Sequence, residues 1–233
     1  GIGNTLKFTI ISNIVKLIPA LLIAIMLQEG LKGKGLYRTL LYLPSILPFV
    51  IIGLVFKSIL NYNNGLLNAI LDALHLGILK QKWLSDLGVV WKSIYGVDAW
   101  RGIGYVMTIF LAGLNTIPRS YYEAAEIDGA SRWQKIAKIT LPLLKPTIII
   151  MFLLQVGGIL GGAVDPIMGM TQLNPSLLET TDTIATFVYR SAMVNGNFAS
   201  GSAITLYQSI FGFLFVTFCN WIVKKVDPEY VLF

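Results

Sequence analysis

Five apolar stretches, each close to the length needed to cross a lipid bilayer, constrain the fold of this chain more than any other feature of its sequence. A transmembrane helix needs about 20 mostly apolar residues in a row. The stretches cover residues 6–27, 36–60, 89–114, 147–164 and 203–223. They predict an all-α integral membrane protein.

The composition agrees with this class. Of the 233 residues, 55% are hydrophobic and only 13% are charged, whereas soluble domains carry about 25% charged residues. A soluble protein this apolar would have too little polar surface to cover itself.

Two of the stretches are irregular. Pro44 and Pro48 are expected to kink the second one. The third contains Lys92, Asp98 and Arg101, so its first half is too polar to face lipid. Ionisable groups inside a membrane face a cavity or a partner. Internal ion pairing, for example of Asp98 with a nearby base, is the alternative to a place in a pathway.

The fourth stretch contains Gly157, Gly158, Gly161 and Gly162. Small residues at this spacing let two helices pack backbone to backbone in lipid. A close helix contact is therefore expected there, although the same face would also leave room for a bulky solute.

The basic residues predict the orientation in the membrane. If residues 123–142 face the cytoplasm, so do ten of the eighteen Lys and Arg, namely Lys32, Lys34, Arg38, Arg119, Arg132, Lys135, Lys138, Lys145, Lys224 and Lys225. The opposite orientation would put Lys80, Lys82 and Arg190 inside as the main loop bases. The positive-inside rule favours the first arrangement.

The outer connections are then residues 61–88 and 165–201. Leucines and isoleucines within residues 66–74 are spaced for a short amphipathic helix at the membrane surface. The second connection is polar and long for a structureless loop, so a helix is expected around residues 183–193.

A charged segment at residues 123–142 lies between two of the apolar stretches. A polar segment held between two spans must lie in water on one side, where it can meet a soluble partner. An ordinary solvated loop is the alternative, because charge runs are usually solvated faces.

Local signals in and beside this segment indicate two short helices joined at a corner. Ser120 with Glu123 fits a capping box, and Ser131 with Gln134 fits a second. Gly129 between them can adopt the left-handed conformation that ends a helix. The acids lie in the first helix and the bases in the second, so the two helices can attract each other.

The spacing Glu123-Ala124-Ala125, Gly129, Ile139, Leu141-Pro142 resembles the EAA motif of permease subunits of bacterial ABC importers. In that family this loop is the coupling helix, which docks on a cytoplasmic ATPase. The resemblance implies a type I ABC importer permease fold and an ATPase-coupling role for Glu123, Ala124, Ala125, Asp128, Gly129 and Arg132.

Other segments resemble sugar permeases of the oligosaccharide uptake class. They are residues 4–6, 42–44, 111–118, 128–133 and 139–142, with residues 174–175, 182–190 and 196–198 resembling the branch for complex oligosaccharides and polysaccharides. The resemblance implies one transmembrane domain at residues 1–233, with a cytoplasmic coupling loop at 117–145. Because the chain starts at Gly1 and related permeases usually carry another span upstream, a missing N-terminal span is expected.

The implied function is import of an oligosaccharide or polysaccharide fragment across the bacterial cytoplasmic membrane by alternating access. The implied partners are a second permease subunit, two ATP-binding subunits, an extracytoplasmic solute-binding protein and the lipid bilayer. ATP and Mg would be bound by the ATPase partner, and no cofactor is expected in this chain. A permease for an amino acid or phosphonate, and a channel or scaffold without energy coupling, remain alternatives.

Several kinds of chemistry are not indicated. The chain has no G-x-x-x-x-G-K-[ST] phosphate-binding loop. With His75 as the single histidine, a His-based metal cluster or a Ser-His-Asp triad is not expected. The chain has a net charge of +6, but its basic residues do not form a stripe with interleaved aromatics, so nucleic-acid binding is not expected either. Cys219, the single cysteine, cannot form a disulfide within the chain.

The candidate pathway is centred on Lys16, which lies near the middle of the first stretch. A charge there faces protein or a wet cavity rather than lipid. Asn13 and Gln155 would line the same cavity, with Asp165 at the outer end of the fourth stretch. Such groups bind sugars by hydrogen bonds, and a lysine attracts a carboxylate, so an acidic oligosaccharide is the hypothesis. The alternative is that Lys16 pairs with an acid on the partner permease.

Overall fold

The structure is a computed structural model that describes residues 1–29, 33–161 and 164–226. Within these residues every regular element is helical. The elements are α1 (Ile2–Gln28), α2 (Lys34–Ile46), α3 (Phe49–Ile59), α4 (Leu66–Ala73), a 3₁₀ turn (Gly77–Leu79), α5 (Val90–Asn115), α6 (Arg119–Ile127), α7 (Arg132–Lys135), a π turn (Ile136–Thr140), α8 (Leu141–Gly157), α9 (Val164–Thr171), α10 (Pro175–Thr181), α11 (Ile184–Tyr189), a second π turn (Arg190–Val194) and α12 (Phe198–Val226).

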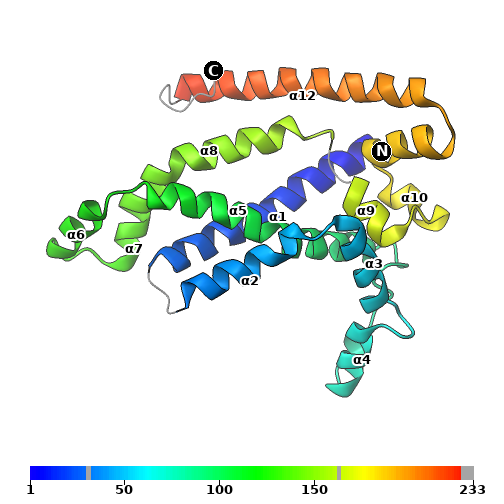
Figure 1. The fold of residues 1–233 in the computed structure, drawn as a ribbon, viewed down its shortest axis with the longest axis horizontal. Helices are drawn as coiled ribbons and strands as arrows, with labels where there is room; N and C mark the ends of the chain where they lie inside the picture. Colours follow the sequence, from blue (N-terminus) through cyan, green and yellow to red (C-terminus); the bar gives the residue numbers. More distant parts are fainter. Residues whose placement is uncertain (30–32, 162–163, 227–233) are drawn as a thin grey trace.

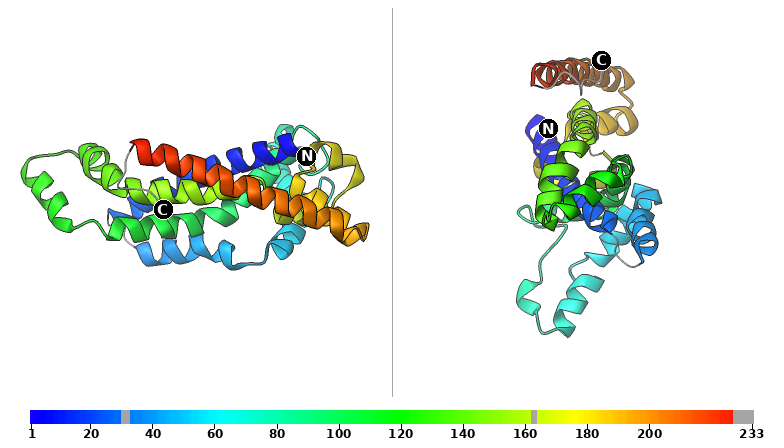
Figure 2. Two further views of the ribbon diagram at one scale, coloured as in Figure 1. Left: turned by 90° about the horizontal axis from the view of Figure 1, so that it is seen from above. Right: turned by 90° about the vertical axis from the view of Figure 1, so that its left-hand side faces the viewer.

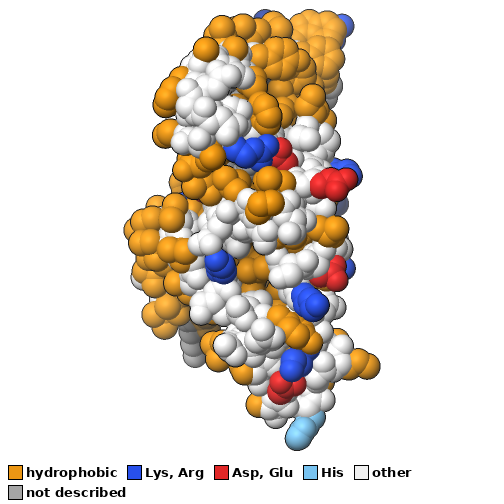
Figure 3. Space-filling view, turned by 90° about the vertical axis from the view of Figure 1, so that its right-hand side faces the viewer, with side chains coloured by type: hydrophobic (Ala, Val, Ile, Leu, Met, Phe, Trp, Pro, Cys, Tyr) orange, Lys and Arg blue, Asp and Glu red, His pale blue; other side chains and the backbone are white. Residues whose placement is uncertain are grey.

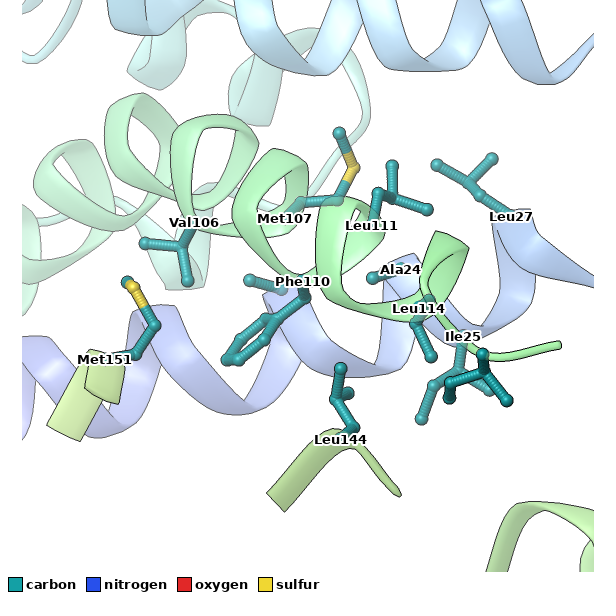
Figure 4. Packing of buried hydrophobic residues seen from close by; sticks show 12 residues of the cluster. Ala24, Ile25, Leu27, Val106, Met107, Phe110, Leu111, Leu114, Leu144 and Met151 are labelled. Atoms are coloured by element: carbon teal, nitrogen blue, oxygen red, sulfur yellow. The ribbon is translucent and has the colours of Figure 1, made fainter. Parts of the chain in front are cut away.

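The helices form an elongated bundle in which α5 packs against α1, α2 and α8 (Figure 1). Side chains of α5, among them Phe110 and Leu114, pack with Ala24 of α1 and Leu144 of α8 in one buried cluster (Figure 4). The helices α6 and α7 form the corner, which projects at one end of the bundle, the corner end. The helices α4, α9 and α10 lie at the opposite end (Figures 1 and 2).

Three helical segments of the described chain are long and apolar enough to cross a membrane: residues 2–28, 132–157 and 198–225. They confirm the first and fifth expected spans and, with shifted bounds, the fourth. The helix α5 has the length of a span with its 26 residues but is not among them. It carries Lys92, Asp98 and Arg101 in its first half, and it lies inside the bundle.

The second expected span is broken, not merely kinked. The helices α2 and α3 meet at 97°. The break lies at Leu47, which is extended with ψ 137°, and at Pro48, the N-cap of α3. A residue before proline is pushed out of the helical region by the pyrrolidine ring, so Pro48 ends one helix and starts the next, while Pro44 lies inside α2. Arg101 donates from Nε to the freed Leu47 carbonyl at 3.5 Å.

The fourth span lies nearer the corner than expected. It runs from Arg132 through the π turn to Gly157 as one helical segment of 26 residues, not from 147 to 164. It ends at its glycines, with Gly158 as the C-cap. The predicted second helix of the charged segment is thus the beginning of this span.

The glycine contact predicted for the fourth span is present at one of its glycines. A Cβ on Gly212 of α12 would lie 2.7 Å from the Gly157 carbonyl oxygen, while one on Gly158 or Gly161 would meet only its own segment. Gly162 and Lys32 lie outside the described residues. A tighter contact that the sequence did not indicate joins α3 to α9, where a Cβ on Gly53 would lie 2.4 Å from Gly169.

The connections at the end opposite the corner contain more helix than the sequence predicted. The amphipathic helix is confirmed as α4, and the expected helix near residues 183–193 is confirmed as α11 with its π turn. The expectation of a polar connection from residue 165 was wrong, because α9 buries Pro166, Ile167 and Met170 against the bundle. The glycine contact with α3 makes α9 part of the packed core.

Candidate functional site

The corner end is built mainly by local backbone signals. The capping box predicted for Ser131 and Gln134 is confirmed: the Ser131 amide donates to Gln134 Oε1 at 2.7 Å, and the Gln134 amide donates to Ser131 Oγ at 3.3 Å. Gly129 has φ +73°, the left-handed conformation expected of it. The box predicted for Ser120 and Glu123 was wrong, since α6 begins after Pro118 without a side-chain cap.

Side chains tie α6 to the start of the fourth span. Lys135 Nζ lies 2.7 Å from Glu126 Oε1, so the predicted attraction between the two helices is confirmed. The hydroxyls of Tyr122 and Thr140 are 3.0 Å apart. Because α7 continues into α8 through the π turn, a displacement of the corner moves the end of a membrane-crossing helix.

A third side-chain contact joins the corner to the end of α1. Arg132 forms a salt bridge with Glu29. The sequence did not single out Glu29, and an acidic residue just after the first span was its only signal.

The outer surface of the corner exposes large hydrophobic side chains. Ile127 is 88% exposed and Trp133 is 77% exposed. Among the predicted coupling residues, Glu123, Ala124, Asp128, Gly129 and Arg132 are exposed, and Ala125 is half-buried. Aromatic anchors are typical of protein interfaces, so this surface has the composition of a docking site.

Behind the corner is a cavity of about 850 Å³ between the end of α1 and α6–α7. Charged side chains of both signs line it, including Glu29, Lys34, Arg119, Glu123 and Lys135. The corner is therefore attached to the bundle by polar contacts around this cavity and by packing of Tyr122, Ile136 and Ile139 against the buried cluster.

The interior of the bundle holds the second group of polar side chains. Lys16 Nζ of α1 lies 3.0 Å from Asp98 Oδ2 of α5. The Ser12 hydroxyl donates to the same carboxylate oxygen, and the stem of Lys16 lies over Gly102. Asp98 is 8% exposed. The structure thus pairs Lys16 within this chain and gives Asp98 the nearby base that was one expectation for it.

The other predicted pathway residues do not join this group. Asn13 and Gln155 are half-buried, and Asp165 is exposed in the first turn of α9. No hydrogen bond or ion pair among the described residues connects any of the three to Lys16. Ser12, which the sequence reasoning missed, lies one helical turn before Lys16, and that spacing was a usable signal.

Comparison with known proteins agrees with this architecture. Residues 20–230 match the family model described as "Binding-protein-dependent transport system inner membrane component". The trehalose/maltose transport system permease protein MalF of Thermococcus litoralis is 34% identical over 202 residues. That match covers 87% of this chain and 66% of the relative, so the chain spans just under two thirds of its length.

Two solved structures of a bacterial alginate ABC transporter contain a similar chain. One is of the transporter involved in the import of the acidic polysaccharide alginate, with a TM-score of 0.89 and 26% identity over 97% of this chain and 78% of that one. The other is in complex with an alginate pentasaccharide-bound periplasmic protein, with the same TM-score and identity over 97% and 77%. Together with the family match, the helical bundle and the projecting corner, these likenesses show that the chain belongs to the family of binding-protein-dependent transport system inner membrane components, the permeases of ABC importers.

Proposed function

We propose that this chain is the permease subunit of an ATP-driven importer that moves an oligosaccharide or a polysaccharide fragment into the cytoplasm. The observation that carries the proposal is the corner, where α6 and α7 project from one end of the bundle (Figure 1). Each helix has one largely exposed hydrophobic side chain, Ile127 in α6 and Trp133 in α7. A family match over residues 20–230 supports it.

In this proposal the corner is the coupling helix, and residues 117–145 are the cytoplasmic coupling loop. Ile127 and Trp133 enter a cleft on a separate ATPase subunit, with Glu123, Ala124, Ala125, Asp128, Gly129 and Arg132 shaping the contact. ATP and Mg are bound by that subunit. Closure of the ATPases moves the corner, and the continuous segment from Arg132 to Gly157 carries the movement into the membrane.

The interior ion pair supports a model in which different helices move separately during transport. Lys16 and Asp98 join α1 to α5, so these two helices move together while α8 follows the corner. Asn13 and Gln155, which are half-buried, and Asp165, which is exposed, remain our candidates for hydrogen bonds to the solute. The sugar transporters among the relatives support a carbohydrate rather than an amino acid or a phosphonate.

The proposed partners are a second permease, two ATPase subunits and an extracytoplasmic solute-binding protein. The helix α12 supports a subunit contact within the bilayer. Only 6% of its most apolar 18-residue stretch is buried. The helix lies along one side of the bundle (Figure 2). Lipid and a second permease are the two apolar surroundings that such a helix would meet.

Reconstitution tests the proposal. The complex is assembled in proteoliposomes with its ATPase and binding protein, and uptake of a labelled oligosaccharide is followed together with ATP hydrolysis. The substitutions Ile127→Ala and Trp133→Ala together should reduce both rates at least tenfold, because interface anchors of this kind contribute about 2 kcal/mol or more.

The matched control is Ile78→Ala. Ile78 is 94% exposed, but it lies in the 3₁₀ turn at the opposite end, so both rates should stay at the parent level. Equal losses in both variants would show that exposed apolar side chains matter in general and not the corner. Uptake that continues without ATP would favour the alternative of a channel.

A further inference from the structure

A second cavity lies at the end of the bundle opposite the corner. Its volume is about 370 Å³, which lies within the range of small-molecule sites. The end of α3, the loops on either side of α4 and the end of α9 form its walls. Polar side chains that line it include Lys57, Asn61, Lys82, Ser85, Gln172 and Asn174. The cavity is distinct from the interior pair and from the corner.

The charged side chains that line this cavity are basic. Among the residues that the structure describes, its lining contains Lys57 and Lys82 and no aspartate or glutamate. Two other bases at this end are paired with acids: Lys80 lies 2.7 Å from Asp72, and Arg190 lies 2.9 Å from Asp182. Figure 3 views this end and shows some basic side chains beside acidic ones and others among polar and apolar atoms.

Neither cavity lysine has an acidic partner among the described residues. Lys57 Nζ donates to Gln172 Oε1, and an ammonium group has further N–H donors to offer. Lys82 Nζ lies 5.8 Å from the centre of the Tyr62 ring, a cation–π contact. Both contacts position a charge without neutralising it.

One wall is held by a buried asparagine. Asn68, which is 2% exposed, donates from Nδ2 to the Tyr62 carbonyl at 3.1 Å and to the Gln81 carbonyl at 3.3 Å. Its Oδ1 accepts from Trp83 Nε1 at 2.8 Å. These three bonds clamp the two loops that carry Tyr62 and Lys82, so this wall is preorganised.

The opposite wall stores backbone strain. Gln172 and Leu173 have φ values of 50° and 54°, the left-handed region that residues other than glycine rarely adopt. Residues in such conformations cluster at active sites, ligand clamps and switch regions, where the surrounding structure holds them. The strain turns the chain after α9 so that Gln172 meets Lys57.

We propose that this cavity binds the carboxylate of an acidic sugar unit as an oligosaccharide enters the permease from outside. Lys57 and Lys82 supply charge-assisted hydrogen bonds to the carboxylate, which are stronger than bonds between neutral groups. Asn61, Ser85 and Asn174 supply donors and acceptors for sugar hydroxyls. The inference rests on the proposed function, and it assigns the substrate class as a uronate-containing glycan.

The shape of the site favours a glycan over an acidic side chain of the binding protein. The site is a concavity with an apolar floor of Leu60, Met170 and Leu177, all buried, beneath a polar rim. Protein docking surfaces are instead centred on exposed aromatic or apolar anchors within a broad patch. An apolar floor beneath polar groups suits a sugar ring, whose faces are apolar and whose edges carry hydroxyls.

Direct binding tests the inference independently of transport. The assembled complex in nanodiscs is titrated calorimetrically with a uronate trisaccharide and with its carboxyl-reduced neutral counterpart. Substituting Lys57→Gln or Lys82→Gln should weaken binding of the uronate about three- to tenfold each, since both lysines remain partly exposed to screening water. Binding of the neutral trisaccharide should change less than twofold.

The matched control is Lys80→Gln. Lys80 has its own acid, and the hydrogen bond with Asp72 raises its pKa, so this variant should bind the uronate as the parent does. Unchanged uronate affinity in the Lys57→Gln and Lys82→Gln double variant would overturn the inference, whatever the uptake assay gives. Equal weakening for both trisaccharides, or weaker binding of the solute-binding protein alone, would also overturn it. Failure of ATP-driven uptake with uronate binding intact would instead reject the proposed function.

Discussion

Two ion pairs of similar length lie in the two halves of this molecule, and they do different things. Lys135 and Glu126 are 2.7 Å apart at the corner, where the Glu126 side chain is 64% exposed. Lys16 and Asp98 are 3.0 Å apart in the bundle, where the Asp98 side chain is 11% exposed. If the corner pair breaks, water solvates both charges. If Lys16 or Asp98 loses its partner, the remaining charge lies in a medium of low dielectric constant.

The distance between two opposite charges is therefore a poor guide to how much the pair contributes to stability. An exposed pair contributes about 0–1 kcal/mol, because water screens it and holding two long side chains costs entropy. Removing one partner of a buried pair costs about 3–5 kcal/mol, because the other charge stays buried without compensation. The Glu126–Lys135 pair therefore adds little to the stability of the corner, while the Lys16–Asp98 pair holds α1 and α5 together.

The largest effect is expected for Lys16→Met. It should destabilise the assembled complex by about 3–5 kcal/mol because Asp98 loses its counter-charge. Heat-induced unfolding in nanodiscs measures this. Uptake of an acidic and of a neutral glycan of equal length should fall equally, because Asp98 already neutralises the lysine. Selective loss of the acidic glycan would instead support contact between Lys16 and the solute.

Two variants make the Lys16 result interpretable. Lys7→Met is the same change at an exposed position of the same helix, and it should leave stability within about 0.5 kcal/mol. Adding Asp98→Asn to Lys16→Met should restore much of the loss, since no charge is then left unpaired. A single Lys16→Met variant as stable as the parent would show that the pair is not desolvated.

An intermediate effect is expected for Gly129→Val. A β-branched residue at φ +73° costs about 1–3 kcal/mol of local strain. The strain should misplace the corner and lower the ratio of uptake to ATP hydrolysis, with the spans still inserted. Gly129→Asn is the matched control because asparagine tolerates this conformation. Normal coupling in the valine variant would mean that the geometry of the corner does not matter.

The smallest effect is expected for Glu126→Gln. Loss of the exposed pair with Lys135 should change stability by about 0–1 kcal/mol and less in high salt. A double-mutant cycle over Glu126 and Lys135, set beside one over Lys16 and Asp98, measures the contrast directly. Equal coupling energies in the two cycles would remove the distinction between the two regions.

The corner was predictable from sequence because its determinants are local. The capping residues Ser131 and Gln134 are three positions apart, and Gly129 needs only its own backbone conformation. The failed prediction has a physical reason too, since Pro118 begins α6 and leaves Ser120 inside the helix. The apolar stretches likewise predicted the helices that lie along the bundle.

The interior was less predictable because its contacts join distant parts of the chain. Ser12 and Asp98 are 86 positions apart, and nothing in either segment specifies the other. The same holds for Gly53 and Gly169, whose backbones touch across α3 and α9. The break between α2 and α3 was signalled by Pro44 and Pro48, but its 97° angle depends on packing with α9 and α5.

If the corner lies in the cytoplasm and the charged cavity faces outward, single cysteines at the two ends of the molecule will be labelled from opposite sides of the membrane. The background is a Cys219→Ser variant, since Cys219 is the only native thiol. Cysteines replace Lys34 and Ser131 in the half of the molecule near the corner, and Asn174 at the other end. A membrane-impermeant maleimide should label Asn174→Cys in intact cells, and Lys34→Cys and Ser131→Cys only in inverted vesicles. Labelling of Ser131→Cys from outside intact cells would contradict this orientation.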